Sequence, residues 1–231
     1  MNELIWFGFL FLDLSMVLLL FYLFEKQGVY GVIVMNIILC NIQVAKNVEL
    51  FGLTVTLGNI LYGSIFFSTD ILSEFYGKKE AQQAVYLGFA VLVLMTIYMQ
   101  IALLFQPAPS DLVDPHLQGI FGLVPRIALG SLVAYLLSQC HDIWLYQVCK
   151  EWTKGKHLWL RNNLATLSSQ AIDSVVFCII AFYGLYDTKI LIEIVITTFL
   201  FKAIVALLDT PFLYLARKIF RLKYSHNKTQ K

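Results

Sequence analysis

The fold is decided by residues 159–173, which read Trp-Leu-Arg-Asn-Asn-Leu-Ala-Thr-Leu-Ser-Ser-Gln-Ala-Ile-Asp. The residues that follow, 174–182, are almost all apolar and are typical of a membrane helix. Polar side chains recur at helical spacing on one face of this segment, at Asn162, Thr166, Gln170 and Asp173 and then at the aromatic Phe177. A carboxylate halfway through an apolar span is costly unless it faces a polar interior, so the stripe predicts a lined cavity. The alternative is that these groups only join neighbouring helices.

Composition places the chain among helical membrane proteins. Hydrophobic residues make up 59% of its 231 residues and charged residues 14%, against roughly 25% charged residues in soluble domains. A polytopic α-helical protein accounts for this balance, because every backbone polar group must be paired inside the bilayer. Residues 4–24 have no basic residue before them and no small-residue cleavage site after them, so no signal peptide is predicted.

Seven apolar stretches are each long enough to cross a bilayer, for which about 20 residues are needed. They are 4–24, 28–46, 53–75, 82–105, 120–147, 164–186 and 190–212. The short connections at 25–27 and 186–188 imply antiparallel neighbours. Lys and Arg residues concentrate in alternate connections and after the last span, so we predict a cytoplasmic C-terminus and an outward-facing N-terminus.

Several other spans carry polar residues at depths where they need a partner or a ligand. The second span carries Asn36 and Asn41. The third carries a helical series that consists of Asn59, Tyr62, Phe66, Asp70 and Glu74. Glu74 has a second interpretation as a surface acid, because Gly77-Lys78-Lys79 ends the helix beside it.

The fifth span has a polar and aromatic edge, which consists of Ser131, Tyr135, Gln139, Asp142 and Tyr146. Asp142 approaches the cytoplasmic end, where Arg161 and Asn162 begin the sixth span. A cluster of Asp70, Asp142 and Arg161 at the inner mouth is therefore geometrically feasible. Lys202, near the middle of the last span, has two open interpretations: contact with a ligand, or an ion pair with another helix.

Motifs for other activities are missing from the sequence. There is no nucleotide-binding Gly-x-x-x-x-Gly-Lys-[Ser/Thr] loop, no His-Glu-x-x-His and no Gly-x-Ser-x-Gly. The four histidines are scattered and the four cysteines have no paired spacing. We therefore predict no enzyme activity, no metal or cofactor and no nucleic-acid partner. Inward-facing amides, carboxylates and aromatic rings within a bilayer instead suit uptake of a small, flat, polar molecule.

Several ordered segments resemble one known family. They are Ser68–Gly77, Pro125–Tyr135, Ser138–Asp142, Leu158–Asn163, Gln170–Ser174, Phe201-Lys202 and Thr210-Pro211. Together they look like the bacterial queuosine-precursor transporters, also called the vitamin uptake transporter family. The resemblance runs from about residue 28 to residue 214.

The resemblance implies import of 7-deazaguanines across the bacterial inner membrane for tRNA modification. The substrates would be the nitrile or aminomethyl precursor of queuosine or the free base queuine. It also implies a six-helix core at 28–214, similar to the substrate-binding subunits of energy-coupling-factor importers, with an additional helix at 1–27 and a basic cytoplasmic tail at 215–231. Those subunits dock an ATPase partner through an Ala-x-x-x-Ala pair, and the matching stretch offers only Ala45. A transporter without an ATPase module is favoured; the alternative is a substrate-capture subunit. A homo-oligomer is left open.

The chemistry of a guanine-like ring assigns roles to the polar residues. Its N–H edge suits an ionised carboxylate, and its carbonyl suits an amide, Lys or Arg donor. We expect Asp173 or Asp70 on the N–H edge and Asn36, Gln170 or Lys202 on the carbonyl. Stacking on the ring is expected from Phe66, Tyr135 or Phe177. Asn41 and Gln139 complete the predicted substrate site, and Glu74, Asp142, Arg161 and Asn162 form a predicted network at the inner mouth.

Overall fold

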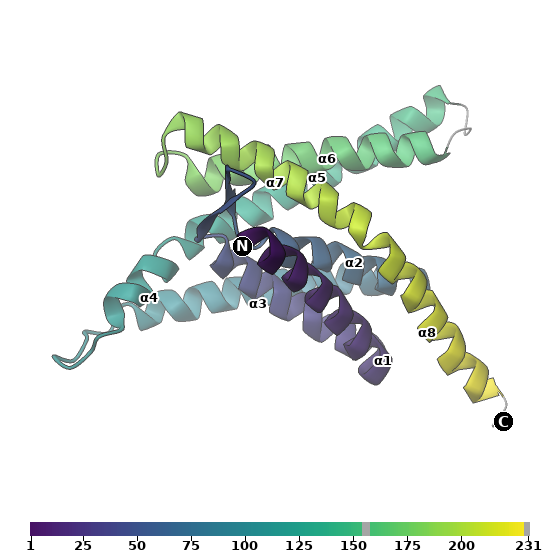
Figure 1. The fold of residues 1–231 in the computed structure, drawn as a ribbon, viewed down its shortest axis with the longest axis horizontal. Helices are drawn as coiled ribbons and strands as arrows, with labels where there is room; N and C mark the ends of the chain where they lie inside the picture. The colour runs from purple at the N-terminus through teal and green to yellow at the C-terminus, as the bar shows by residue number, and fades with distance from the viewer. Residues whose placement is uncertain (154–157, 229–231) are drawn as a thin grey trace.

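The chain is almost entirely helical, as predicted. The structure is a computed structural model that describes residues 1–153 and 158–228. Its helices are α1 (Asn2–Gln43), α2 (Asn59–Tyr76), α3 (Lys78–Ala102), α4 (Asp114–Phe121), α5 (Val124–Trp152), α6 (Leu158–Phe182), α7 (Thr188–Leu208) and α8 (Thr210–Lys228). One hairpin, β1 (Asn47–Leu50) with β2 (Leu53–Thr56), lies between α1 and α2. In Figure 1, α5 and α6 run side by side and project together at the upper right.

Helix α1 contains two antiparallel halves that meet at Glu25. The backbone there is non-helical, with φ 55° and ψ −136°. The halves then run back along each other, since a Cβ built at Gly28 would overlap the carbonyl oxygen of Leu20. Further along, the Asn36 amide donates to the Asp13 carboxylate across the same contact. The two predicted spans at 4–24 and 28–46 are thus antiparallel neighbours, as their short connection indicated.

The predicted span at 53–75 is wrong at its start, because residues 53–56 form β2 and the helix begins only at Asn59. The turn between the strands is Phe51-Gly52, and both residues have positive φ, 53° and 75°. That geometry is the one that best continues the twist of two strands joined by a two-residue turn. Val48 and Val55 face each other across the hairpin, where β-branched side chains are favoured.

Two further predicted spans are divided in the structure. The stretch 120–147 contains the end of α4 and most of α5, with Pro125 in the first turn of α5, where its missing N–H costs nothing. The stretch 190–212 contains α7 and the start of α8. Residues from 215 onward continue α8 to Lys228, and Phe220 of this helix stacks on Phe75 of α2 with ring centroids 4.6 Å apart.

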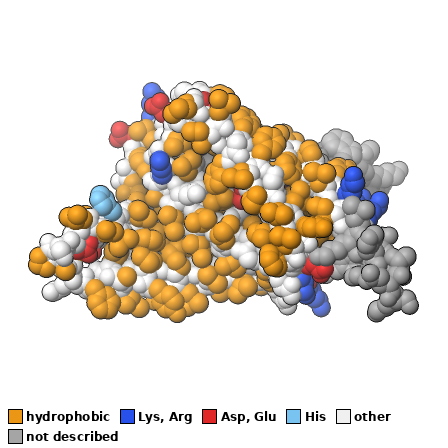
Figure 2. All heavy atoms as spheres, turned by 60° about the horizontal axis from the view of Figure 1, so that its bottom comes forward, with side chains coloured by type: hydrophobic (Ala, Val, Ile, Leu, Met, Phe, Trp, Pro, Cys, Tyr) orange, Lys and Arg blue, Asp and Glu red, His pale blue; other side chains and the backbone are white. Residues whose placement is uncertain are grey.

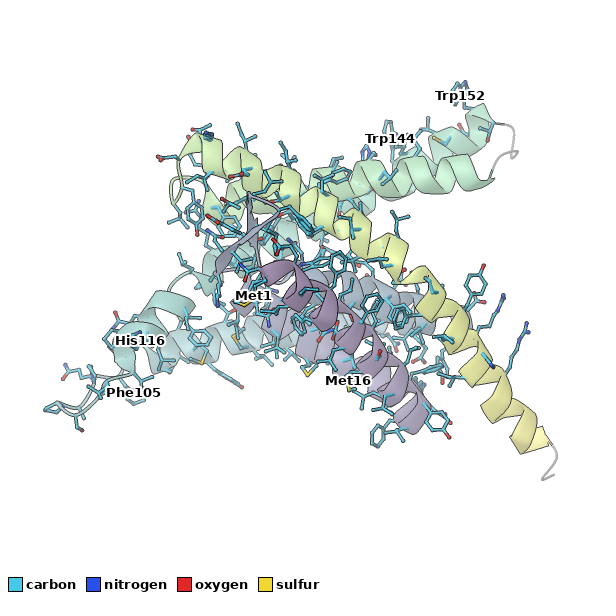
Figure 3. All side chains as sticks on the ribbon, in the orientation of Figure 1. Met1, Met16, Phe105, His116, Trp144 and Trp152 are labelled. Carbon is cyan, nitrogen blue, oxygen red and sulfur yellow. The ribbon has the colours of Figure 1, made fainter. Side chains whose placement is uncertain are left out.

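Apolar side chains cover most of the outside of the molecule, as Figure 2 shows for one face. Within the described residues, four helical segments are long and apolar enough to cross a membrane: Asn2–Gln43, Lys79–Ala102, Asp114–Ser138 and Thr188–Arg221. Trp144 and Trp152 project from the extended part of α5 and are also exposed (Figure 3). Such a surface suits contact with lipid rather than with water.

One close helix contact makes a test of the packing. A Cβ built at Gly63 of α2 would overlap the side chain of Val205 on α7. We expect Gly63→Ala to lower the free energy of unfolding by about 1–3 kcal/mol, because overpacking forces the two helices apart. Gly31→Ala is the matched control, since no atom lies within 4 Å of its Cβ position. Thermal unfolding of both variants in detergent measures the difference, and equal melting temperatures would contradict the contact.

Candidate functional site

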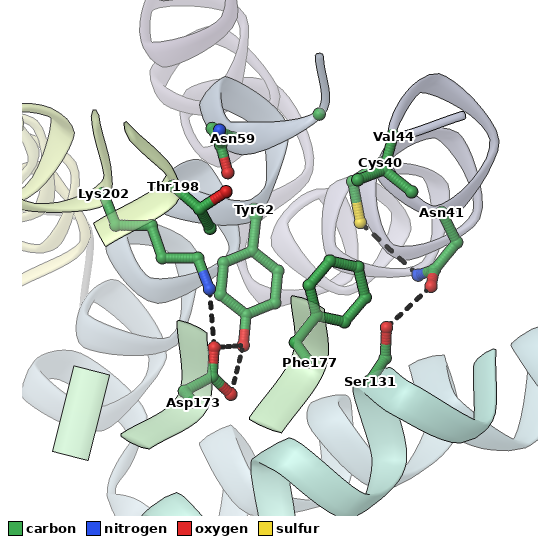
Figure 4. Close-up of a pocket in the computed structure, with 11 residues that line it drawn as sticks. Cys40, Asn41, Val44, Asn59, Tyr62, Ser131, Asp173, Phe177, Thr198 and Lys202 are labelled. Carbon is green, nitrogen blue, oxygen red and sulfur yellow. Dashed lines mark hydrogen bonds and ion pairs between the residues drawn. The ribbon is translucent and has the colours of Figure 1, made fainter. Parts of the chain in front are cut away.

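A polar pocket lies where α1, α2, α5, α6 and α7 meet (Figure 4). Its lining residues come from all five helices and from the end of the hairpin connection. They are Cys40, Asn41, Val44, Gly58, Asn59, Tyr62, Ser131, Asp173, Phe177, Thr198 and Lys202. The atom-free space between them, counted out to the open mouth, is about 360 Å³.

One wall of the pocket is an ion pair between α6 and α7. Lys202 Nζ lies 2.5 Å from Asp173 Oδ2, and the two side chains are only 6% and 8% exposed. The Tyr62 hydroxyl of α2 donates to both carboxylate oxygens, at 3.2 Å each. Lys202 Nζ also lies 4.1 Å from the centre of the Tyr62 ring, within cation–π range. Three helices therefore hold two opposite buried charges in one fixed arrangement.

These charged groups keep hydrogen-bonding capacity for a ligand. A carboxylate offers about four acceptor positions and an ammonium three donors. The Lys202 ammonium donates one hydrogen bond to Asp173, and Tyr62 donates to the same carboxylate. An acceptor position on Asp173 and further donors on Lys202 can therefore face a molecule in the pocket without loss of the ion pair.

The opposite wall of the pocket consists of an amide, a hydroxyl group and an aromatic ring. Ser131 Oγ of α5 donates to Asn41 Oδ1 at 2.8 Å, and Asn41 Nδ2 donates to the Ile37 carbonyl at 2.7 Å. In Figure 4 the Phe177 ring lies between this pair and the Tyr62 ring. The pocket thus offers charges on one side and an aromatic face beside an amide on the other.

The hairpin lies next to the pocket and is tied to the helices around it. Thr197 Oγ of α7 donates to the Thr54 carbonyl of β2 at 3.1 Å. Asn59 Nδ2, from a lining residue, donates to the Thr56 carbonyl at 3.2 Å. Strand β2, which was predicted as the start of a membrane span, instead positions the first turn of α2 beside the pocket.

Three predicted substrate residues line the pocket together: Asn41, Asp173 and Lys202. Lys202 forms an ion pair with another helix, which was one interpretation of this residue. It also lines the cavity, as the other interpretation, contact with a ligand, requires. Phe177, one of three candidates for ring stacking, lines the pocket as well.

Other predicted substrate residues lie elsewhere. Asn36 is fully buried and bonds to Asp13 and Ser64. Phe66 packs edge-on against Tyr62, and Tyr135 packs against Phe89. Gln170 lies about one turn from Asp173 outside the lining. Asp70 is exposed. The side chain of Gln139 lies outside the described part of the structure.

The predicted inner-mouth network is described at one residue only. Glu74 forms an ion pair with Arg217 of α8, with Arg217 Nη2 3.0 Å from Glu74 Oε1. Both side chains are about half exposed. The side chains of Asp142, Arg161 and Asn162 lie outside the described residues, so their grouping stays a prediction.

Sequence reasoning did not select Tyr62, although it belongs to the helical series from Asn59 to Glu74 that the sequence shows. Tyr62 lies four residues before Phe66, so the two side chains are on the same face of α2. Sequence reasoning placed Ser131 on the polar edge of the fifth span but gave it no role in the site. It did not name Thr198, because a single hydroxyl inside an apolar span is common and carries little signal. Only the contact between α1 and α5 shows that Ser131 serves Asn41.

Fold and pocket together define a class: a helical, multi-pass membrane protein with a charged and aromatic pocket enclosed between its helices. A family profile described as "Putative vitamin uptake transporter" matches residues 56–216. The chain is also 43% identical, over 219 residues, to a Bacillus subtilis (strain 168) protein named "Probable queuosine precursor transporter". That match covers 94% of this chain and 96% of the relative. The chain therefore belongs to the vitamin uptake transporter family, as its motifs predicted. No solved structure matches it.

Proposed function

We propose that the protein imports queuosine precursors, 7-deazaguanine bases, across the bacterial inner membrane. The observation that carries the proposal is the pocket in which Asp173, Lys202, Asn41 and Phe177 converge from three helices. Membership of a transporter family supports transport, and the name of the Bacillus subtilis relative supports the substrate class. No catalytic step is part of the proposal: the molecule is released unchanged.

The proposed topology has seven crossings, with the N-terminus outside and the C-terminus in the cytoplasm. The two halves of α1 supply the first two, and α2, α3, α5, α6 and α7 supply the others. Residues 1–27 are the additional helix, 28–214 the core and 215–231 the basic cytoplasmic end. In this orientation Asn41, Tyr62 and Ser131 belong to the outer half of the bilayer. The pocket would therefore receive its substrate from outside.

The proposed binding mode follows from the chemistry of the two walls. The N–H groups of a guanine-like edge would donate to Asp173, and a spare donor of Lys202 would reach the ring carbonyl. The ring would lie against the face of Phe177. Asn41 is held by Ser131 and is available to polar atoms at the far side of the ring.

We propose that the transporter works without a dedicated ATPase module, since only Ala45 matches the docking pair of energy-coupling-factor subunits. The alternative is a substrate-capture subunit that passes its cargo to such a module. Co-purification with an ATPase, together with loss of uptake when that ATPase is deleted, would favour the alternative.

Uptake in a bacterium that can neither make nor import the precursor tests the function directly. The gene should restore queuosine in tRNA when one of the deazaguanines is supplied, and the panel of bases identifies the preferred one. Failure with every base, from protein that is present in the membrane, would contradict the proposal.

The role of Phe177 can be measured separately. Phe177→Ala is expected to raise the KM for uptake about tenfold or more, because stacking of a base on an aromatic ring contributes about 1–3 kcal/mol. Ile179→Ala is the matched control on the same helix, since Ile179 is 47% exposed and does not line the pocket. Similar KM values for the two variants would place the ring away from the substrate.

A further inference from the structure

A second polar cluster lies outside the pocket, between the two halves of α1 and α2. Its members are Asp13, Asn36 and Ser64, and their exposed fractions are 7%, 0% and 0%. Asn36 Nδ2 donates to Asp13 Oδ1 at 3.4 Å and to Ser64 Oγ at 3.3 Å. Asp13 lies about halfway along the first half of α1, where an ionised carboxylate is most costly.

Two acceptor atoms of this cluster are buried without a hydrogen-bond partner among the described residues: Asp13 Oδ2 and Asn36 Oδ1. They belong to the two side chains that the bond from Nδ2 to Oδ1 already joins. If Asp13 were ionised, both would be acceptors that lack a donor, and each would cost about 1–3 kcal/mol. A single proton on Asp13 Oδ2 changes this, because that oxygen then donates to Asn36 Oδ1. The acid and the amide would form a closed pair with two hydrogen bonds.

A metal ion suits the cluster less well than a proton. The Asn36 amide turns its N–H group, not its oxygen, toward Asp13 Oδ1. Sodium and other hard cations need several oxygen ligands around one point. A proton needs only the two oxygen atoms that have no partner.

No cation pairs with Asp13 among the described residues, and its polar neighbours are Asn36 and Ser64. On the packed helices, Tyr62 and Lys202 bond to Asp173, Glu74 pairs with Arg217, and Lys26 and Tyr30 bond to Glu80. Asp70 and Asp209 are like charges and supply no cation. The proton on Asp13 is therefore the means by which this buried carboxyl group is neutralised.

We propose that Asp13 is the site of a coupling proton, bound to Oδ2 as a neutral carboxylic acid paired with Asn36 and imported together with the substrate. This step rests on the proposed transport function. The proton comes from the outer solution, and its O–H bond breaks when it passes to water on the cytoplasmic side. No electron transfer is involved.

The cluster is connected to the pocket through the helices that carry both. Asn36 lies five residues before Asn41 on α1, and Ser64 lies two residues after Tyr62 on α2. Loss of the proton would place an anionic oxygen against the Asn36 carbonyl oxygen, so the two halves of α1 would repel each other at this point. A shift of either helix would move a wall of the pocket.

Two measurements test the inference. In infrared spectra of the purified protein, the carboxylic-acid C=O band should be weaker in Asp13→Asn than in the wild type at pH 7. Unchanged intensity would overturn the proton site, whether or not the protein transports deazaguanines. In proteoliposomes, the wild type should accumulate the base up to about tenfold for each pH unit of imposed gradient, acid outside. Asp13→Asn should equilibrate the base without accumulating it, and equal accumulation by both would overturn the coupling.

Asn at position 13 can form the same closed pair with Asn36, so the variant should fold. Its melting temperature should match that of the wild type at about pH 4 and below, where the unfolded carboxyl group is still largely protonated. As the pH rises above about 4, the wild type should lose stability relative to Asp13→Asn, because only the folded state then keeps the proton. Asp187→Asn, a change at an exposed acid, is the matched control for all three measurements. Wild-type protein that moves no base would overturn the proposed function alone, since the infrared result stands independently.

Discussion

Uptake of deazaguanine is expected to fall at least about a hundredfold when Asp173 is replaced by Asn, and to be abolished by Ala. The amide offers one acceptor oxygen and turns an N–H donor toward the donors of the substrate. Sites built to hydrogen-bond a polar edge lose 10⁴-fold or more when that bonding is mismatched, so about a hundredfold is a conservative figure. Hydrogen bonds to charged groups contribute about 1.5–3 kcal/mol each, which gives the same order for two lost bonds.

Initial uptake rates, normalised to the amount of protein in the membrane, measure this effect. Asp187→Asn is the control, because it removes an exposed carboxylate from the loop that joins α6 and α7. Normal uptake by both the Asn and the Ala variant of Asp173 would remove this residue from the substrate site.

Lys202→Met is expected to lower the free energy of unfolding by about 3–5 kcal/mol, because it leaves the Asp173 carboxylate buried without its cation. For a chain of this size that corresponds to a melting temperature lower by about 10 °C. The double variant Asp173→Asn with Lys202→Met should recover most of that stability, since no buried charge remains unpaired. It should still fail to transport, because both charged groups that we propose as substrate contacts are gone.

Arg217→Met provides the comparison for the loss of unfolding free energy in Lys202→Met. It breaks the pair with Glu74, in which both side chains are about half exposed, so the expected change is below about 1 kcal/mol. Thermal unfolding in detergent measures all these variants together. A Lys202→Met protein as stable as Arg217→Met would mean that Lys202 and Asp173 do not form a buried ion pair.

The site could be predicted from the sequence at the level of helix faces but not of contacts. The spacing of Gln170, Asp173 and Phe177 identified the inward face of α6, and the depth of Lys202 identified a residue that needed a partner. That Asp173 is this partner depends on how α6 and α7 pack, which periodicity does not record. Spacing also does not show how far a cavity extends along a helix. Gln170 therefore lies on the same face as Asp173 but outside the pocket lining.

The hairpin could not be read from hydropathy. Residues 53–57, Leu-Thr-Val-Thr-Leu, join the apolar residues of α2 into one stretch that is long enough to span. The available signal was local: Gly52 and Gly58 allow the positive φ values that turns require, and polar and apolar residues alternate along both strands. A rule that joins apolar residues into spans of about 20 overrides such short signals.

The reversal of α1 at Glu25 bears on how the protein is made. Because the two halves follow each other without a loop, they emerge from the ribosome in immediate succession, and N-terminal elements fold first during synthesis. The first half contains Asp13, and its partner Asn36 arrives only 23 residues later. The two halves can therefore leave the translocon as one inserted hairpin, in which Asn36 already faces Asp13 before α2 has been translated.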